Sequence, residues 1–136
     1  MPKRNVVIVL DDDSSMLSGV KRILALHGFD SDLFDSAERF YTRARFDEAL
    51  CLVLDIHLKG TTGIEVRRQL ALSGNSLPVI FITGKDSERT RTQAMEAGCV
   101  AYLVKPFPSN LLVDAIATSS VGADWKSCHA SGYNGS

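Results

Sequence analysis

The sequence predicts an α/β domain with a doubly wound, five-stranded parallel sheet and five helices. Three observations support this prediction. Short runs of branched aliphatic residues alternate with segments in which apolar residues recur at helical spacing. Most of these runs lack alternating polar positions, which is typical of strands buried on both faces. Turn-forming or polar residues follow the runs directly. Right-handed crossovers then leave few ways to wind the sheet.

The expected strands are short, mostly apolar runs. They cover residues 6–10, 29–34, 51–55, 77–82 and 100–104. The second of these runs has mixed polarity, whereas the others are rich in aliphatic side chains. The third run ends in one carboxylate, Asp55, and is followed by the glycines Gly60 and Gly63. We therefore place Asp55 at the carboxyl end of a strand that is buried on both faces.

The expected helices have start or stop signals of their own. In the first helix, apolar residues recur at helical spacing from Met16 onward, and His27-Gly28 stops it. Asp13 or Ser14 is placed to cap its start. The other helices are expected at residues 36–46, 64–72, 86–97 and 109–118. Strands and helices therefore alternate along the chain, as a parallel sheet requires.

The composition narrows the class of protein. A chain of 136 residues fits one domain and can bury roughly two-thirds of the surface that its unfolded form exposes. The net charge of −1 gives no general attraction to nucleic acid or to an anionic membrane. No apolar run approaches a membrane span, and the amino terminus lacks the apolar segment of a signal peptide. We expect a cytoplasmic protein whose segment contacts neither membrane nor nucleic acid.

The cysteines and the last residues carry no motif of their own. Cys51 and Cys99 border expected strands and are predicted to be small core residues, and no cysteine has metal-ligand spacing. Residues 122–136 are small, polar and aperiodic. We expect one domain over residues 1–121, followed by a flexible tail or the start of a linker over residues 122–136.

Polar side chains follow four of the expected strands. Asp11 and Asp12 follow the first strand, and Asp55 ends the third. Thr83 follows the fourth strand and Lys105 the fifth. The carboxyl ends of parallel strands meet at one edge of an α/β sheet, where ligands bind, so these side chains should converge. We prefer this interpretation to a set of turn and helix-capping residues, although turns also favour aspartate.

The chemistry of these five side chains fits phosphoryl transfer. Neighbouring carboxylates repel one another, and a hard divalent cation bound through oxygen neutralises them. Mg²⁺ suits such a site because it keeps positions for water and for a phosphate. The Thr83 hydroxyl and the Lys105 ammonium can hold phosphoryl oxygens. Asp55 can then act as a nucleophile toward phosphorus and become an aspartyl phosphate.

Several short motifs also occur in a specific order and spacing. They are Val9-Leu10-Asp11-Asp12-Asp13, Leu54-Asp55 with Gly63 beyond, Ile82-Thr83-Gly84, Ala97-Gly98 and Tyr102-Leu103-Val104-Lys105-Pro106-Phe107. With them the sequence resembles the receiver domain of bacterial two-component response regulators, from about residue 5 to about residue 120. Phe81-Ile82-Thr83-Gly84 and Glu96-Ala97-Gly98 look most like receivers of LuxR-type regulators in the nitrogen-fixation branch. This resemblance implies a flavodoxin-like fold with strand order 2-1-3-4-5.

The resemblance implies that Asp55 is the phosphoacceptor. Asp12 would bind Mg²⁺ directly, Asp11 would bind it directly or through water, and Asp55 and the backbone carbonyl of His57 would complete the protein ligands. The phosphoryl donor would be a sensor histidine kinase or a phosphotransfer protein. Such a domain catalyses its own phosphorylation and hydrolysis as a regulator, so we do not expect a turnover enzyme.

The same resemblance implies a conformational switch. Thr83 and Lys105 would hold the phosphoryl group, and the bond from Lys105 to Pro106 would be cis. Tyr102 would turn inward as Thr83 moves toward the phosphate, whereas the plainer alternative is an aromatic residue packed in the core. The fourth helix, fifth strand and fifth helix would form the surface that a partner reads. Phosphorylation could also produce a homodimer, which is common in the family.

Lys59, His57 and Lys85 lie close to the expected site residues in the sequence. The family usually has proline at the place of Lys59, so we expect a less rigid loop after Asp55. His57 and Lys85 each lie two residues beyond a site residue, where a hydrolytic water would approach. We expect these two side chains to tune the lifetime of the aspartyl phosphate. In the alternative, the His57 side chain is idle and only its backbone contributes.

Two alternatives stay open at the level of sequence. Haloacid-dehalogenase-like phosphatases also use Asp, Thr, Lys and Mg²⁺, but they need a second acid two residues after the nucleophile, where this chain has His57, and a substrate cap. The second alternative concerns the output. The chain is either a stand-alone receiver or a truncated part of a regulator whose helix-turn-helix domain follows residues 122–136. It contains no recognition helix or basic patch, so DNA binding would belong to residues outside it.

Overall fold

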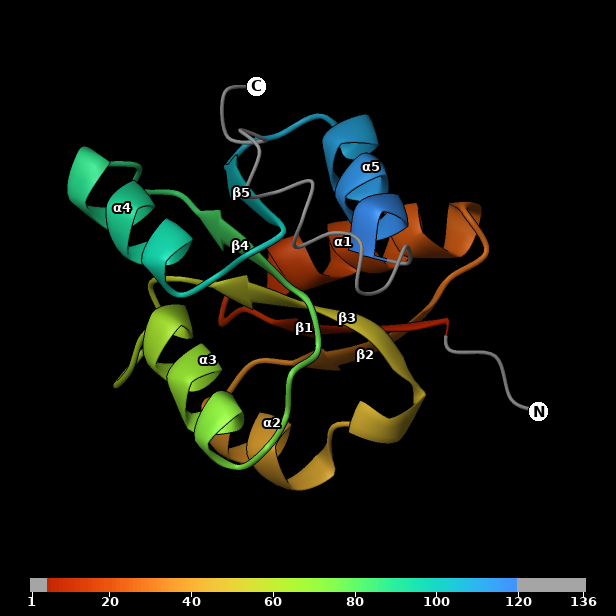
Figure 1. Ribbon diagram of the computed structural model, residues 1–136. Helices are drawn as coiled ribbons and strands as arrows, with labels where there is room; N and C mark the ends of the chain where they lie inside the picture. The colour runs from red at the N-terminus through yellow and green to blue at the C-terminus, as the bar shows by residue number, and fades with distance from the viewer. Residues whose placement is uncertain (1–4, 120–136) are drawn as a thin grey trace.

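The computed structural model describes residues 5–119 and confirms the expected fold (Figure 1). Five parallel strands form one sheet in the order β2-β1-β3-β4-β5. The strands are β1 (Val6–Leu10), β2 (Asp30–Phe34), β3 (Ala49–Asp55), β4 (Val79–Thr83) and β5 (Ala101–Val104). The helices are α1 (Ser14–Leu26), α2 (Ala37–Arg43), α3 (Gly63–Leu72), α4 (Glu88–Glu96) and α5 (Ser109–Ser119). A short 3-10 helix, η1 (Phe46–Glu48), precedes β3.

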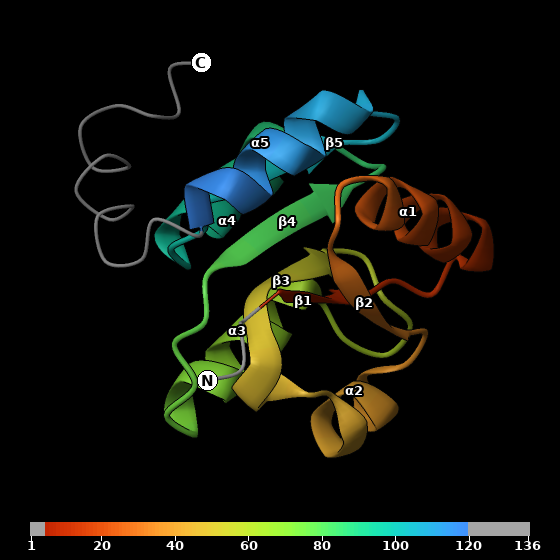
Figure 2. The same cartoon turned by 90° about the vertical axis from the view of Figure 1, so that its right-hand side faces the viewer.

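Helices cover both faces of the sheet (Figures 1 and 2). Helices α1 and α5 pack on one face, and their buried side chains Val20, Leu24, Leu112 and Ile116 lie in one core cluster. Helices α2, α3 and α4 pack on the other face through a second cluster that contains Phe40, Val66, Leu70 and Ala94. Because helices cover both faces of the sheet, every residue of β1 and β4 is buried.

The second helix is shorter than predicted. It begins after the N-cap Ser36 as expected, but it ends at Arg43 and does not continue through Phe46. The cause is a contact from another strand: the Arg45 backbone N–H donates to the Asp32 carboxylate in β2 at 2.9 Å. Phe46 instead starts η1 and packs edge-on against Phe40, with ring centroids 5.4 Å apart.

Three other boundaries move by two residues. Strand β3 begins at Ala49, earlier than predicted. Strand β4 begins at Val79 and not at residue 77, because Pro78 has no backbone N–H to add to the ladder, although its carbonyl accepts from Leu52. Helix α4 begins at Glu88, since the Ser87 side chain is its N-cap and accepts from the Thr90 N–H.

Within residues 5–119, the structure also confirms one predicted helix cap and two predicted core cysteines. Asp13, one of the two expected caps, caps α1 by accepting from the backbone N–H groups of Ser15 and Met16. Cys51 and Cys99 are free and fully buried, as predicted, and burial raises their pKa values to about 12 and about 11. The expected tail at residues 122–136 lies outside the described residues.

Among the described helices, none combines the length and the apolar character that a bilayer span needs.

Candidate functional site

The strand register brings the predicted site residues to one edge of the sheet. Leu10 pairs with Leu54, so Asp11 and Asp55, which follow them, come next to one another. Asp55 in turn pairs with Ile82, the residue before Thr83. Thr83 pairs with Val104, so Lys105 lies just beyond the same edge. Four strands therefore deliver the expected polar side chains to one place.

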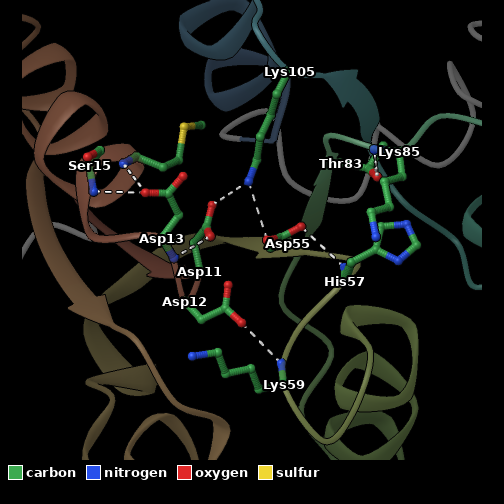
Figure 3. Close-up of polar contacts among 11 residues, drawn as sticks. Asp11, Asp12, Asp13, Ser15, Asp55, His57, Lys59, Thr83, Lys85 and Lys105 are labelled. Carbon is green, nitrogen blue, oxygen red and sulfur yellow. Dashed lines mark hydrogen bonds and ion pairs between the residues drawn. The ribbon is translucent and has the colours of Figure 1, made fainter.

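Three carboxylates form an acidic cluster at this edge. Each of Asp11, Asp12 and Asp55 places a carboxylate oxygen within 4.8 Å of the other two (Figure 3). Asp11 is fully buried, Asp55 is 4% exposed, and Asp12 is half-buried. Three oxygen donors at this spacing, one of them on a partly exposed residue, match the requirements of a hard divalent cation that keeps some of its waters. We call these three residues the acidic cluster.

The Lys105 ammonium brings positive charge to the acidic cluster. Its Nζ lies 2.8 Å from Oδ2 of Asp11 and 3.3 Å from Oδ2 of Asp55 (Figure 3). Burial lowers the pKa of Lys105, but its contacts with Asp11 and Asp55 outweigh burial, and the net shift is upward. The Lys105-Pro106 peptide bond is cis, as the resemblance implied.

One ammonium does not balance the buried acids. Burial, and then the neighbouring charge of Asp11, raise the pKa of Asp55 to about 6, although Lys105 opposes the shift. Asp55 is therefore more easily protonated than an ordinary aspartate. Binding of a further cation would favour its ionised form.

Backbone N–H groups hold the oxygen atoms of all three acids. The Asp13 N–H donates to Asp11 at 2.9 Å, and the His57 N–H donates to Asp55 at 3.2 Å. The Lys59 N–H donates to Asp12 at 3.1 Å and so connects two loops that are far apart in sequence. Because these donors belong to the backbone, they orient the carboxylates without placing another side chain in the site.

Gly63 has a steric role at the same strand end. It is the first residue of α3, and its N–H donates to the Ile56 carbonyl at 2.9 Å. A Cβ at this position would overlap the carbonyl oxygen of Asp55. The glycine in the Asp55 motif therefore allows α3 to approach the end of β3 closely.

Thr83 is fully buried at the end of β4, and its hydroxyl oxygen accepts from the Lys85 backbone N–H at 2.9 Å. Among residues 5–119, the Thr83 hydroxyl donates no hydrogen bond, so its proton is available. The side chains of Lys85 and His57 are both exposed near this edge.

Tyr102 lies in β5 and belongs to a second group of polar contacts. Its hydroxyl donates to Oδ1 of Asp86 at 2.8 Å, and the Arg91 guanidinium binds the other oxygen of Asp86 at 2.6 Å. The guanidinium carbon of Arg91 also lies 5.5 Å from the centre of the Tyr102 ring. We call Tyr102, Asp86 and Arg91 the tyrosine cluster.

The tyrosine cluster contains residues that sequence reasoning missed. No sequence motif assigned a site role to Arg91 or Asp86, which both lie in the stretch expected to form the fourth helix. Tyr102 is half-buried, and burial, together with Asp86, raises its pKa to about 12. The sequence offered one usable signal, namely that serine is a preferred N-cap residue, and a helix capped by Ser87 leaves Asp86 outside it.

Known proteins resemble this chain in sequence over the same region. A family model described as the response regulator receiver domain matches residues 7–117. The chain is 32% identical over 114 residues to the response regulator protein TodT of Pseudomonas putida strain F1, with 84% of this chain and 50% of TodT covered. It is 33% identical over 115 residues to nodulation protein W of Bradyrhizobium diazoefficiens, with 85% and 51% covered. The chain thus spans about half the length of these curated relatives.

Solved structures agree with this result. The response regulator StyR superimposes with a TM-score of 0.79 at 34% identity, covering 93% of this chain and 64% of StyR. The structure of FixJ-N gives a TM-score of 0.75 at 28% identity, covering 86% and 94%. The likeness to FixJ-N agrees with the branch expected from the motifs. Because the family model matches most of the chain, this protein belongs to the family of response regulator receiver domains of two-component systems.

Proposed function

We propose that this receiver domain accepts a phosphoryl group on Asp55 from a sensor histidine kinase or a phosphotransfer protein. The observation that carries the proposal is the position of Lys105, with Nζ 2.8 Å from Asp11 and 3.3 Å from Asp55. An ammonium in this place can meet a phosphoryl oxygen on Asp55 without leaving the site. The burial of Asp55 keeps bulk water away from it.

Mg²⁺ is the cofactor that fits the donor atoms. Asp11, Asp12 and Asp55 would hold it, with the backbone carbonyl of His57 as a further ligand. When bound, the ion supplies positive charge that offsets the repulsion between the carboxylates and the incoming phosphoryl oxygens. The oxygen-only donor set disfavours the softer transition metals that prefer nitrogen or sulfur ligands.

The transfer needs Asp55 in its ionised form. One carboxylate oxygen attacks phosphorus and forms the O–P bond. The bond from phosphorus to the donor's histidine nitrogen breaks, and its electron pair stays on the imidazole. Since the pKa of Asp55 is about 6, most molecules hold the nucleophile ready at neutral pH. The Thr83 hydroxyl proton and the Lys105 ammonium then bind the new phosphoryl oxygens.

The output is a change in the surface formed by α4, β5 and α5. Movement of Thr83 toward the phosphoryl group would let Tyr102 leave Asp86 and turn inward. Phosphorylation shifts the populations of two states only through contacts that differ between them, here those of Thr83 and Lys105. The altered surface would bind a partner or a second copy of the chain in the cytoplasm.

The domain acts as a regulator and not as a turnover enzyme. Its family gives no support to the haloacid-dehalogenase-like alternative. The side chains of His57 and Lys85 are exposed, and in this proposal they would tune how fast water removes the phosphoryl group. Replacing both by alanine should change the decay rate of the phosphorylated form, and an unchanged rate would contradict this role.

The first test is the intact mass of the protein after incubation with acetyl phosphate and Mg²⁺. We expect one added phosphoryl group in the wild type and none in Asp55→Asn or after removal of the metal. Asp35→Asn, at an exposed aspartate outside the acidic cluster, is the matched control and should be phosphorylated normally. An equal adduct in Asp55→Asn would overturn the proposed phosphoacceptor.

A further inference from the structure

The loop after β3 contacts the acidic cluster through one main-chain group. The Lys59 backbone N–H donates to Oδ2 of Asp12, with an N···O distance of 3.1 Å. The two residues are 47 positions apart and lie in the loops that follow β3 and β1. The Lys59 side chain is exposed, so its amide is the part of this residue that faces the site.

Asp12 differs from the other two acids of the cluster in how it is held. Asp11 and Asp55 are buried and both contact the Lys105 ammonium. Asp12 is half-buried, and within residues 5–119 its side chain has one hydrogen bond, the one from Lys59. A half-exposed carboxylate samples several rotamers unless something fixes it, so this bond selects the observed orientation.

The geometry leaves the second oxygen of Asp12 available. Figure 3 shows Oδ2 directed toward the Lys59 nitrogen and the other oxygen turned toward the side of Asp11 and Asp55. One carboxylate can accept a hydrogen bond on one oxygen and bind a cation with the other. Groups that hold a metal ligand in this way raise the affinity of the site because less ordering remains to be done on binding.

We propose that the Lys59 main-chain amide is a positioning group for divalent metal binding. It holds the Asp12 carboxylate so that its second oxygen joins those of Asp11 and Asp55. The inference rests on the proposed Mg²⁺ site and deepens it. The group that acts is the N–H and not the ammonium, so any residue except proline supplies it at this position.

The test compares two substitutions that both remove the ammonium. Lys59→Ala keeps the N–H, and Lys59→Pro lacks it. Proline requires a negative φ, and residue 59 does not have a positive one, so its φ does not rule out this substitution. We expect the Mg²⁺ dissociation constant, measured by isothermal titration calorimetry, to be about three- to tenfold higher for Lys59→Pro than for Lys59→Ala. Thermal unfolding of both variants controls for folding.

A second measurement uses the folded wild type and does not depend on the proline variant. Amide hydrogen exchange at Lys59 should be slowed in the metal-free wild type, because its N–H is bonded. Asp12→Ala removes the acceptor and should speed exchange at Lys59 several-fold, while the His57 amide, bonded to Asp55, keeps its rate.

The outcomes separate this inference from the proposed function. Equal Mg²⁺ dissociation constants for the folded alanine and proline variants would overturn the role of the amide and leave the metal site intact. Unchanged exchange at Lys59 in Asp12→Ala would overturn the bond itself. Absence of saturable Mg²⁺ binding in the wild type would overturn the proposed metal site, and this inference with it.

Discussion

The acidic cluster and the tyrosine cluster differ in how deeply their carboxylates are buried and in how fully those carboxylates are paired with donors. The acidic cluster places Asp11 and Asp55 out of contact with water and offers them the ammonium of Lys105. The tyrosine cluster surrounds one exposed carboxylate, Asp86, with two donors. The first region has too little positive charge for its acids, whereas the second has its acid fully paired.

This difference predicts which region responds to a change in charge. A buried group with an unmet charge is sensitive to protons, cations and phosphoryl groups, because each changes a strong interaction at low dielectric. An exposed group with satisfied partners contributes little to stability and mainly fixes a conformation. Under the proposed function, the acidic cluster would receive the phosphoryl group, and the tyrosine cluster would hold one state of Tyr102 until then.

Removal of the Lys105 ammonium should have the largest effect on the free energy of unfolding. Lys105→Met leaves Asp11 and Asp55 facing one another in a buried site. We expect the free energy of unfolding at pH 7.5 in metal-free buffer to fall by about 2–4 kcal/mol, measured by urea denaturation. Lys85→Met, which removes an exposed ammonium near the same edge, is the control and should cost less than about 0.5 kcal/mol. Equal losses in the two variants would remove the contrast between buried and exposed charge.

Neutralising Asp55 should have a smaller effect of opposite sign. The pKa of Asp55 is about 6 in the folded protein, above its ordinary value of 3.8, so the folded form binds its proton more tightly. The contribution of Asp55 to stability should therefore fall as pH rises from about 4 to about 6. Asp55→Asn should remove this fall and gain about 1–3 kcal/mol at pH 7.5 without metal, with the gain shrinking below pH 4.

The pH series distinguishes electrostatics from packing. Urea denaturation of the wild type and Asp55→Asn at several pH values measures both curves. A gain that stays constant from pH 4 to pH 7.5 would mean that asparagine improves packing, and that the charge of Asp55 costs nothing.

The tyrosine cluster should show the smallest effect. Asp86→Asn keeps an acceptor for Tyr102 but loses the charge that binds Arg91. We expect a loss of at most about 1 kcal/mol, since the pair is exposed, together with a lower pKa of Tyr102 in ¹³C-tyrosine NMR. Asp35→Asn is the matched exposed control. A loss larger than that of Lys105→Met would invert the comparison between the two regions.

The sequence predicted the parts of the site that depend on local pattern. Val6–Leu10 and Val79–Thr83 are wholly or almost wholly apolar runs, so both strands and the residues at their ends were expected. The end of the second helix was wrong, because it depends on a hydrogen bond from the Arg45 N–H to Asp32 in a different strand. Pattern along the chain does not contain such a contact.

By itself, the sequence determined the order of elements and which side chains reach the carboxyl edge, since hydrophobic periodicity and strand direction are local or nearly local properties. Only the tertiary structure decided how those side chains pair. It brought Lys105 between Asp11 and Asp55, the Lys59 amide to Asp12, and Asp86 to Tyr102. Each of these contacts joins residues far apart in the chain, and its geometry is set by loop conformation and by the packing of whole elements against the sheet.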